Sequence, residues 1–223
     1  PIEDLSNLAL ERGIGFHSDT CVGSFVLPFL EKLGYDVPLY DFRLPGVTQM
    51  SCDVHKYGYA TKGASVILHR NADWVWLQLF VYESWPSGLY GTPTVAGARP
   101  AGPIAAAWSV MNYLGMDGYL ELMRGLMATT AKIRAGIEAI SELSIMGNPI
   151  GPLLTFTSDV IDTYAVCDLM DDRGWNLDRN TNPNGLHMMI SPLHEKYADE
   201  FLSDLRWAVA NHGESRGIEA RYN

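Results

Sequence analysis

The sequence predicts an α/β fold with a mainly parallel sheet and a small α/β domain at its carboxyl end. Two observations support this prediction. Helical and strand-like patterns alternate along the chain, and 223 residues with 47% hydrophobic content can bury a sizeable core. In folds of this kind ligands bind at the carboxyl ends of the strands. Polar residues that directly follow a predicted strand are therefore the first candidates for a functional site.

The first half of the chain contains one clear helix, several short strands and a long loop rich in glycine and proline. The helix is expected to end at Gly13, and the apolar run after it delivers His17, Ser18 and Asp19 to the end of a strand. Long loops usually carry function. The expected segments are a helix over residues 3–12, strands over 14–16, 64–69 and 76–82, and the loop over 86–103.

The second half of the chain begins with a long helical pattern. This pattern covers residues 103–143 and is interrupted at 115–118, where two glycines stand. We expect a domain boundary near residue 116, with one domain over 1–115 and a second over 116–223. The later segments alternate between strand and helix. They cover residues 153–158, 160–174, 185–191 and a final helix over 195–211.

Charge and cysteine usage restrict the possible partners. A net charge of −10 and an isoelectric point near 4.9 argue against a nucleic-acid partner, because phosphate backbones are bound by clustered lysine and arginine. The chain contains no uninterrupted apolar run of about 18 residues, so no membrane segment is expected. Cys21, Cys52 and Cys167 lack CxxC spacing, which favours a reducing compartment and predicts a cytoplasmic protein. The dispersed histidines predict no metal site.

The segment SCDVHKYGYATKGAS, residues 51–65, places a histidine–lysine pair in a turn of small residues just before a strand. A pyridoxal phosphate (PLP) enzyme needs one lysine whose amine loses its proton and attacks the cofactor aldehyde. Burial beside positive groups lowers the pKa of such an amine. Lys56 is the candidate for this bond. An ordinary exposed turn lysine is the alternative, and on this feature alone it is the better interpretation.

Asp19, at the end of the first predicted strand, can supply the second group that PLP requires. The cofactor withdraws electrons only while its pyridine nitrogen is protonated, and a buried carboxylate beside that nitrogen keeps it so. A helix cap or a turn former is the alternative role, and taken singly that alternative is preferred.

Together these residues form a family pattern. The blocks that carry it are HSDTCVGSFVLPFLEKLGY, FRLPGVTQMSCDVHKYGYATKGAS, YGTPTVAGARPAG, DDRGWNL and GLHMMIS. They resemble the corresponding blocks of the sphingosine-1-phosphate lyases, which form one group of PLP enzymes with the glutamate and aromatic amino-acid decarboxylases. The resemblance implies the PLP-dependent transferase fold, fold type I, of which aspartate aminotransferase is the model.

The resemblance also implies an activity. The lyases cleave a carbon–carbon bond of sphingosine 1-phosphate, or a related phosphorylated long-chain base, to give a fatty aldehyde and phosphoethanolamine. The alternative is a decarboxylase of glutamate or an aromatic amino acid, which would use the same Lys56 and Asp19. A non-catalytic relative is a third interpretation, which the presence of both residues disfavours.

Carried over by position, the resemblance implies that Lys56 holds the cofactor and that Asp19 pairs with its pyridine nitrogen. It also implies that His55 lies beside the cofactor phosphate. Gly91 and Thr92 match a loop that reaches the phosphate of the neighbouring subunit's cofactor. A homodimer with a composite site is therefore expected.

Two further residues are candidates for the same site. Lys62 follows Lys56 by six residues. Given the HKYGYATKG resemblance, we expect it to face the same cavity, where a substrate phosphate would separate the two positive charges. Cys21 is expected either to line the cofactor face or to be a small buried residue.

Only 18 residues precede Asp19, and neither a phosphate-binding turn nor a stacking ring for PLP is identifiable among them. The chain also begins without methionine. We therefore expect the carboxyl-terminal part of a longer protein, a fragment lacking the amino-terminal half, which binds PLP poorly by itself.

Overall fold

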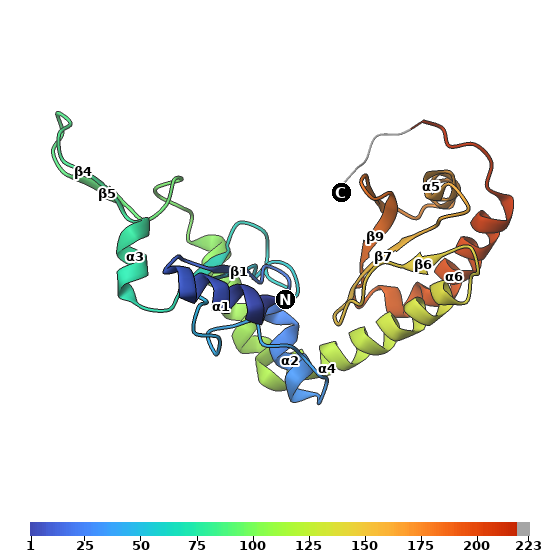
Figure 1. The fold of residues 1–223 in the computed structure, drawn as a ribbon, viewed down its shortest axis with the longest axis horizontal. Coiled ribbons are helices and arrows are strands. Elements are labelled where there is room, and N and C mark those ends of the chain that lie inside the picture. The colour runs from blue at the N-terminus through green and yellow to red at the C-terminus, as the bar shows by residue number, and fades with distance from the viewer. Residues whose placement is uncertain (218–223) are drawn as a thin grey trace. The chain divides into compact units, whose positions relative to one another are not determined.

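The computed structural model describes residues 1–217 and divides into two compact units, Pro1–Leu120 (unit 1) and Glu121–Asn223 (unit 2) (Figure 1). Helix α4 (Gly102–Glu138) belongs to both and is interrupted at Gly115, where φ 56° and ψ −170° are not helical. Glycine adopts a positive φ at little cost, so the break expected at residues 115–118 is confirmed. No helix in the described part of the chain is both long and apolar enough to cross a membrane.

Unit 1 combines a three-stranded sheet, a two-stranded hairpin and short helices (Figure 1). The first helix ends as predicted, because Gly13 has φ 63° and its N–H donates to the carbonyls of Ala9 and Leu10. The elements before α4 are α1 (Ile2–Arg12), β1 (His17–Asp19), the 3-10 helix η1 (Gly23–Phe25), α2 (Leu27–Lys32), β2 (Gln49–Cys52), β3 (Val66–His69), α3 (Ala72–Gln78), β4 (Phe80–Tyr82) and β5 (Tyr90–Thr92).

The sheet of unit 1 has the order β1-β2-β3. β1 and β2 run parallel and are joined by a segment that contains α2, as a crossover connection requires, whereas β2 and β3 are antiparallel. The register places Asp19 opposite Ser51. Both parallel strands therefore end at the same edge of the sheet.

The segment after β3 differs from the prediction. Residues 76–82 do not form one strand, because α3 occupies the first part and β4 begins only at Phe80. The side chain of Asn71 accepts hydrogen bonds from the N–H groups of Asp73 and Trp74, and this cap fixes where the helix starts. The predicted glycine- and proline-rich loop also contains β5, which pairs antiparallel with β4.

Unit 2 contains a four-stranded sheet of order β6-β7-β9-β8, with α5, α6 and the end of α4 beside it (Figure 1). Its elements are β6 (Ser144–Ile145), β7 (Leu153–Thr157), α5 (Thr163–Asp172), β8 (Asp178–Asn180), β9 (Gly185–Met189) and α6 (His194–Asn211). The predicted strands and helices of this half are confirmed, and β6 and β8 are additional.

The sheets in residues 1–217 are mainly antiparallel, not mainly parallel as predicted. β1–β2 is the parallel pair, and the pairs of unit 2 are antiparallel. The prediction assumed a helix between successive strands, which parallel pairing needs. β8 and β9 are instead joined by residues 181–184 alone, and so short a connection reverses the direction of the chain.

The core of unit 2 lies between one face of its sheet and the helices. Leu154 and Phe156 of β7 are buried, while Thr155 between them is only half-buried, so the two faces of the strand differ. α4 and α6 approach closely, because a Cβ at Gly136 would lie 2.4 Å from Leu202 Cδ1. Side chains with essentially no exposed surface include Ile133, Ile137, Phe156, Met170, Phe201 and Leu205.

Candidate active site

The end of the parallel β1–β2 pair brings the predicted cofactor residues together. Asp19 is the last residue of β1, and the turn after β2 carries His55 and Lys56. Cys21 follows Asp19 closely, and its Sγ lies 3.1 Å from Lys56 Nζ. These four residues therefore lie at one edge of one sheet, which is the edge where ligands of such sheets bind.

Asp19 is held as a carboxylate. Its Oδ1 accepts hydrogen bonds from Ser51 Oγ at 2.6 Å and from the N–H of Cys21 at 3.1 Å. These hydrogen bonds hold the pKa of Asp19 below its ordinary value, and the bond from Ser51 has the larger effect. The residue is exposed, not buried as predicted. Hydrogen bonds rather than burial therefore define its charge, and an ionised carboxylate can pair with a protonated ring nitrogen.

The Lys56 amine lies between a thiol and a carboxylate. Nζ is 3.1 Å from Cys21 Sγ and 3.0 Å from Asp53 Oδ2, and 23% of the lysine side chain is exposed. Burial alone lowers the pKa of Lys56, but the hydrogen bonds to Cys21 and Asp53 raise it by more. The lowered pKa that the sequence predicts for Lys56 is therefore not found. The group in contact with its amine is the negatively charged carboxylate of Asp53, which favours the protonated form.

Asp53 is a charged residue of the cluster that sequence reasoning missed. Its Oδ1 accepts a hydrogen bond from Ser65 Oγ at 2.6 Å, and its N–H donates to the Cys21 carbonyl at 3.2 Å. Burial raises the pKa of Asp53, but the hydrogen bonds from Ser65 and Lys56 outweigh it and leave the pKa below its usual value. The available signal is an acidic residue three positions before the lysine, since such residues face each other in a helical turn.

His55 is oriented by the loop that precedes β3. Its Nδ1 lies 3.2 Å from the carbonyl oxygen of Ala64. Because a carbonyl can only accept, Nδ1 carries a proton, and Nε2 of the neutral ring is an acceptor. Nε2 is 3.9 Å from Asp53 Oδ2, too far for a hydrogen bond.

The turn that carries Lys56 has a constrained backbone. At Gly58 an added Cβ would lie 2.4 Å from the carbonyl oxygen of Val54, so only glycine fits. Tyr59 has φ 59°, a conformation that costs a non-glycine residue roughly 1–2 kcal/mol. Tyr119 of α4 donates a hydrogen bond to the Gly58 carbonyl at 2.9 Å. Strain that is held in place by such contacts is common at functional sites.

The remaining predicted residues have contacts elsewhere. Lys62 is exposed in the loop before β3. Gly91 and Thr92 belong to β5, and Thr92 Oγ1 donates to the carbonyl of Thr94 at 2.9 Å. The β4–β5 hairpin projects from the rest of unit 1 (Figure 1). Within one copy of the chain, the structure joins Gly91 and Thr92 to the hairpin and not to the Lys56 cluster.

Comparison with known proteins identifies the relatives of this chain. No protein-family model matches it. It is 44% identical to the sphingosine-1-phosphate lyase of Arabidopsis thaliana over 209 residues, which are 94% of this chain and 38% of the relative. For the Saccharomyces cerevisiae lyase the identity is 40% over 210 residues, 93% of this chain and 36% of the relative. This stretch of chain is homologous to the sphingosine-1-phosphate lyases. It spans less than two fifths of the length of these two lyases.

Solved structures give the fold. The sphingosine-1-phosphate lyase of Burkholderia pseudomallei superimposes with a TM-score of 0.90 at 40% identity, covering 95% of this chain and 49% of the lyase. A glutamate decarboxylase of Lactobacillus brevis superimposes with a TM-score of 0.77 at 18% identity, covering 97% of this chain and 53% of the decarboxylase. The fold is therefore that of the fold type I PLP-dependent lyases and decarboxylases, as the sequence resemblance implied.

The residues of unit 1 fit the cofactor of the lyase family. PLP requires a lysine amine for covalent attachment and a carboxylate beside its ring nitrogen. Lys56 and Asp19 are residues of these two types at the same sheet edge. The hydrogen bonds that Asp19 accepts from Ser51 and from the Cys21 N–H favour its ionised form, which is the form that can pair with a protonated ring nitrogen.

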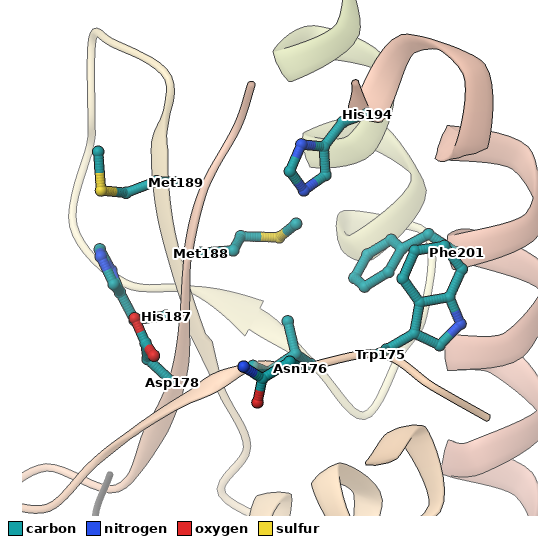
Figure 2. A pocket seen from close by; sticks show the side chains of 9 residues that line it. Trp175, Asn176, Asp178, His187, Met188, Met189, His194 and Phe201 are labelled. Atoms are coloured by element: carbon teal, nitrogen blue, oxygen red, sulfur yellow. The ribbon is translucent and has the colours of Figure 1, made fainter. Parts of the chain in front are cut away.

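A cavity of about 240 Å³ lies within unit 2 and is lined largely by residues of the DDRGWNL and GLHMMIS blocks. Figure 2 shows that it is lined by rings from several segments. His194 Nδ1 accepts the N–H of Ser191 at 3.0 Å, so Nε2 carries the proton of the neutral ring. The lining residues are Trp175, Asn176, Leu177, Asp178, His187, Met188, Met189, His194 and Phe201. This set contains no lysine, so the amine chemistry is assigned to the cluster in unit 1.

Proposed function

We propose that the full-length protein is a PLP-dependent carbon–carbon lyase that cleaves sphingosine 1-phosphate or a related phosphorylated long-chain base. The observation that carries the proposal is that the Lys56 amine and the Asp19 carboxylate both contact Cys21 at the end of the parallel β1–β2 pair. The sequence identity of 40–44% to the lyases of Arabidopsis thaliana and Saccharomyces cerevisiae supports it.

In this proposal each residue of the cluster has one task. Lys56 holds the cofactor covalently, Asp19 keeps a positive charge on its ring nitrogen, and His55 contacts its phosphate. Cys21 lines the space beside the amine. When bound, PLP supplies an electron sink that stabilises the negative charge left on carbon by bond cleavage.

Lys62 is assigned to the substrate. Its exposed amine follows the constrained turn and can bind the phosphate of a long-chain base. In the reaction the substrate hydroxyl next to the amine-bearing carbon loses its proton, and the bond between the two carbons breaks. The hydroxyl carbon leaves as a fatty aldehyde. The amine-bearing carbon takes up a proton and leaves as phosphoethanolamine.

The β4–β5 hairpin supports a homodimer with a composite site. Its aromatic rings pack on each other, with Phe80 and Trp85 within 6.4 Å and 6.2 Å of Tyr90 between ring centroids. Exposed apolar surface of this kind is typical of a protein interface. In a dimer Gly91 and Thr92 would reach the cofactor phosphate of the second copy. The exposed residues of the hairpin include Phe80, Val81, Tyr82, Trp85, Leu89 and Tyr90.

The three free cysteines support a location in the cytoplasm.

The deciding experiment separates a lyase from a decarboxylase. Full-length enzyme is incubated with sphingosine 1-phosphate and, separately, with glutamate, tyrosine and tryptophan, and aldehyde and carbon dioxide are measured. We expect aldehyde release, which Lys62→Ala lowers severely while the cofactor remains attached to Lys56. Lys32→Ala, which removes another exposed lysine of unit 1, is the matched control.

The opposite outcome is equally clear. Carbon dioxide release that does not depend on Lys62, with no aldehyde formed, would assign the protein to the decarboxylases. The same Lys56 and Asp19 would then serve that reaction.

A further inference from the structure

Asp53 makes contacts with three other residues, two through its carboxylate and one through its backbone N–H. Oδ1 accepts a hydrogen bond from Ser65 Oγ at 2.6 Å, a residue 12 positions later in the sequence. Oδ2 contacts Lys56 Nζ at 3.0 Å. The backbone N–H of Asp53 donates to the carbonyl of Cys21, in the loop after β1. A residue that served only to shape its own turn would not need the contacts with Ser65 and Cys21.

The pair of Asp53 and Lys56 is shielded more than an ordinary surface ion pair. Of the side-chain surfaces, 17% of Asp53 and 23% of Lys56 are exposed. Exposed ion pairs contribute little because water and salt screen them and both side chains lose freedom. Here Ser65 already holds the carboxylate, and Cys21 Sγ contacts the amine from a second segment at 3.1 Å. The position of the Asp53 carboxylate therefore does not depend on Lys56 alone, because Ser65 holds it independently.

We propose that Asp53 is a positioning residue, the counter-ion that holds the Lys56 ammonium in the site whenever this amine is not bound to another group, and that Ser65 orients its carboxylate. The inference rests on the proposed function, in which Lys56 alternates between a bound and a free state. A free lysine side chain has many rotamers. The ion pair favours the rotamer that keeps the amine at the sheet edge, in contact with Cys21.

The groups in contact with the Lys56 amine come from two segments of unit 1. Cys21, in the loop after Asp19 of β1, and Asp53, in the turn itself, contact Nζ. His55 Nε2 lies 3.9 Å from Asp53 Oδ2. Asp53 is the carboxylate in contact with Nζ. Its removal should therefore change the proton equilibrium of the free amine more than the removal of any other carboxylate.

The same contact has a chemical consequence. An amine must lose its proton before it can bond to carbon, and a contacting carboxylate favours the protonated form. Asp53 thus keeps the free Lys56 amine protonated and in place at the site. A neutral amide in its place should make the free base more abundant at a given pH and leave it poorly positioned.

Asp53→Asn tests this proposal in the full-length protein freed of cofactor. Trace labelling of lysines with acetic anhydride between pH 7 and 11, read by mass spectrometry, gives the titration midpoint of Lys56 alone. We expect the midpoint to fall and labelling of Lys56 at pH 8 to rise by about fivefold, as the loss of a contacting opposite charge predicts. Asp36→Asn, which removes an exposed carboxylate of unit 1, should leave the midpoint of Lys56 unchanged.

Ser65→Ala is the second variant. It keeps the carboxylate and removes its anchor, so we expect a smaller fall in the midpoint than for Asp53→Asn. It also stands in should Asp53→Asn fail to fold. An unchanged midpoint in a folded Asp53→Asn protein, or in Ser65→Ala where that is the folded variant, would overturn the proposal. The labelling needs neither substrate nor cofactor, so failure of the proposed lyase reaction would be seen separately, in the absence of aldehyde from the parent enzyme.

Discussion

The two units differ in how completely each covers its own apolar surface. In unit 2, Phe156, Ile190 and Leu205 have no exposed surface. In unit 1, by contrast, Leu8 of α1 is 47% exposed and Ile67 of β3 is 43% exposed. Unit 2 is closed around its core by its own residues, whereas unit 1 leaves apolar faces beside its sheet open.

This difference separates stability from chemistry. The candidate cofactor residues lie in the open unit, where Asp19 is exposed and Lys56 is partly exposed. The closed unit holds side chains whose full burial stabilises a fold by roughly 1.5–3 kcal/mol each. Substitutions at the site should therefore remove activity and spare the folding of unit 2, and core substitutions in unit 2 should act on folding.

Lys56→Ala should have the largest effect. In the full-length protein it removes the amine that attaches the cofactor, so turnover should be abolished and borohydride should trap no PLP on the protein. Hydrogen exchange of unit 2 should stay as in the parent. PLP trapped on another lysine would show that the site has been assigned to the wrong amine.

Asp19→Asn should rank second. The variant keeps the shape of the side chain but loses the charge that pairs with the ring nitrogen, so turnover should fall by orders of magnitude and PLP should bind weakly. Asp36→Asn, at an exposed aspartate of the same unit, is the control for loss of one charge. Near-parental rates for Asp19→Asn would remove this residue from the site.

Phe156→Ala should sharpen the comparison from the other side. It leaves a cavity in a closed core and should lower the free energy of unfolding of unit 2 by about 3–5 kcal/mol. Leu8→Ala removes a partly exposed side chain from unit 1 and should change stability in the isolated chain by about 0.5 kcal/mol or less. Hydrogen exchange in urea reads the two units separately. Equal costs for the two substitutions would contradict the difference in closure.

The sequence predicts the closed unit better than the open one. Apolar periodicity is unbroken over α5, β7, β9 and α6, so each is visible from the chain alone. β8 is the tripeptide Asp178–Asn180, whose polar residues pair with β9 through the backbone, and no side-chain pattern marks such a strand. In unit 1, α3 occupies part of the segment predicted as a strand. The side chain of Asn71 caps this helix and fixes where it begins, which the apolar pattern does not reveal.

The site divides in a similar way. The family blocks mark the positions of Lys56 and Asp19, which the structure places at one sheet edge, and their roles toward PLP stay predictions. Asp53 could not be predicted, because its contacts with Ser65 and Cys21 join segments that meet only in three dimensions. The direction of the Lys56 pKa was missed for the same reason, since the contacting carboxylate outweighs burial.

His194 gives the smallest expected effect and tests whether unit 2 is closed around its cavity. The ring lines that cavity at the start of α6 and is half-buried (Figure 2). Burial lowers the pKa of His194 below the ordinary histidine value of about 6.5, so the folded protein favours the neutral ring. The unfolded chain binds a proton there from about pH 6.5 downward, whereas folded unit 2 binds it only at lower pH.

Between these two pKa values the unfolded state holds more protons, so the free energy of unfolding falls as the pH drops through this window. His194→Gln removes the group and should flatten that fall between pH 7 and pH 5, while leaving the other titrating groups in place. Urea unfolding of unit 2 in half-unit pH steps measures the slope. A variant with the slope of the parent would mean that the ring titrates alike in folded and unfolded protein, and that water reaches the cavity as freely as it reaches the open faces of unit 1.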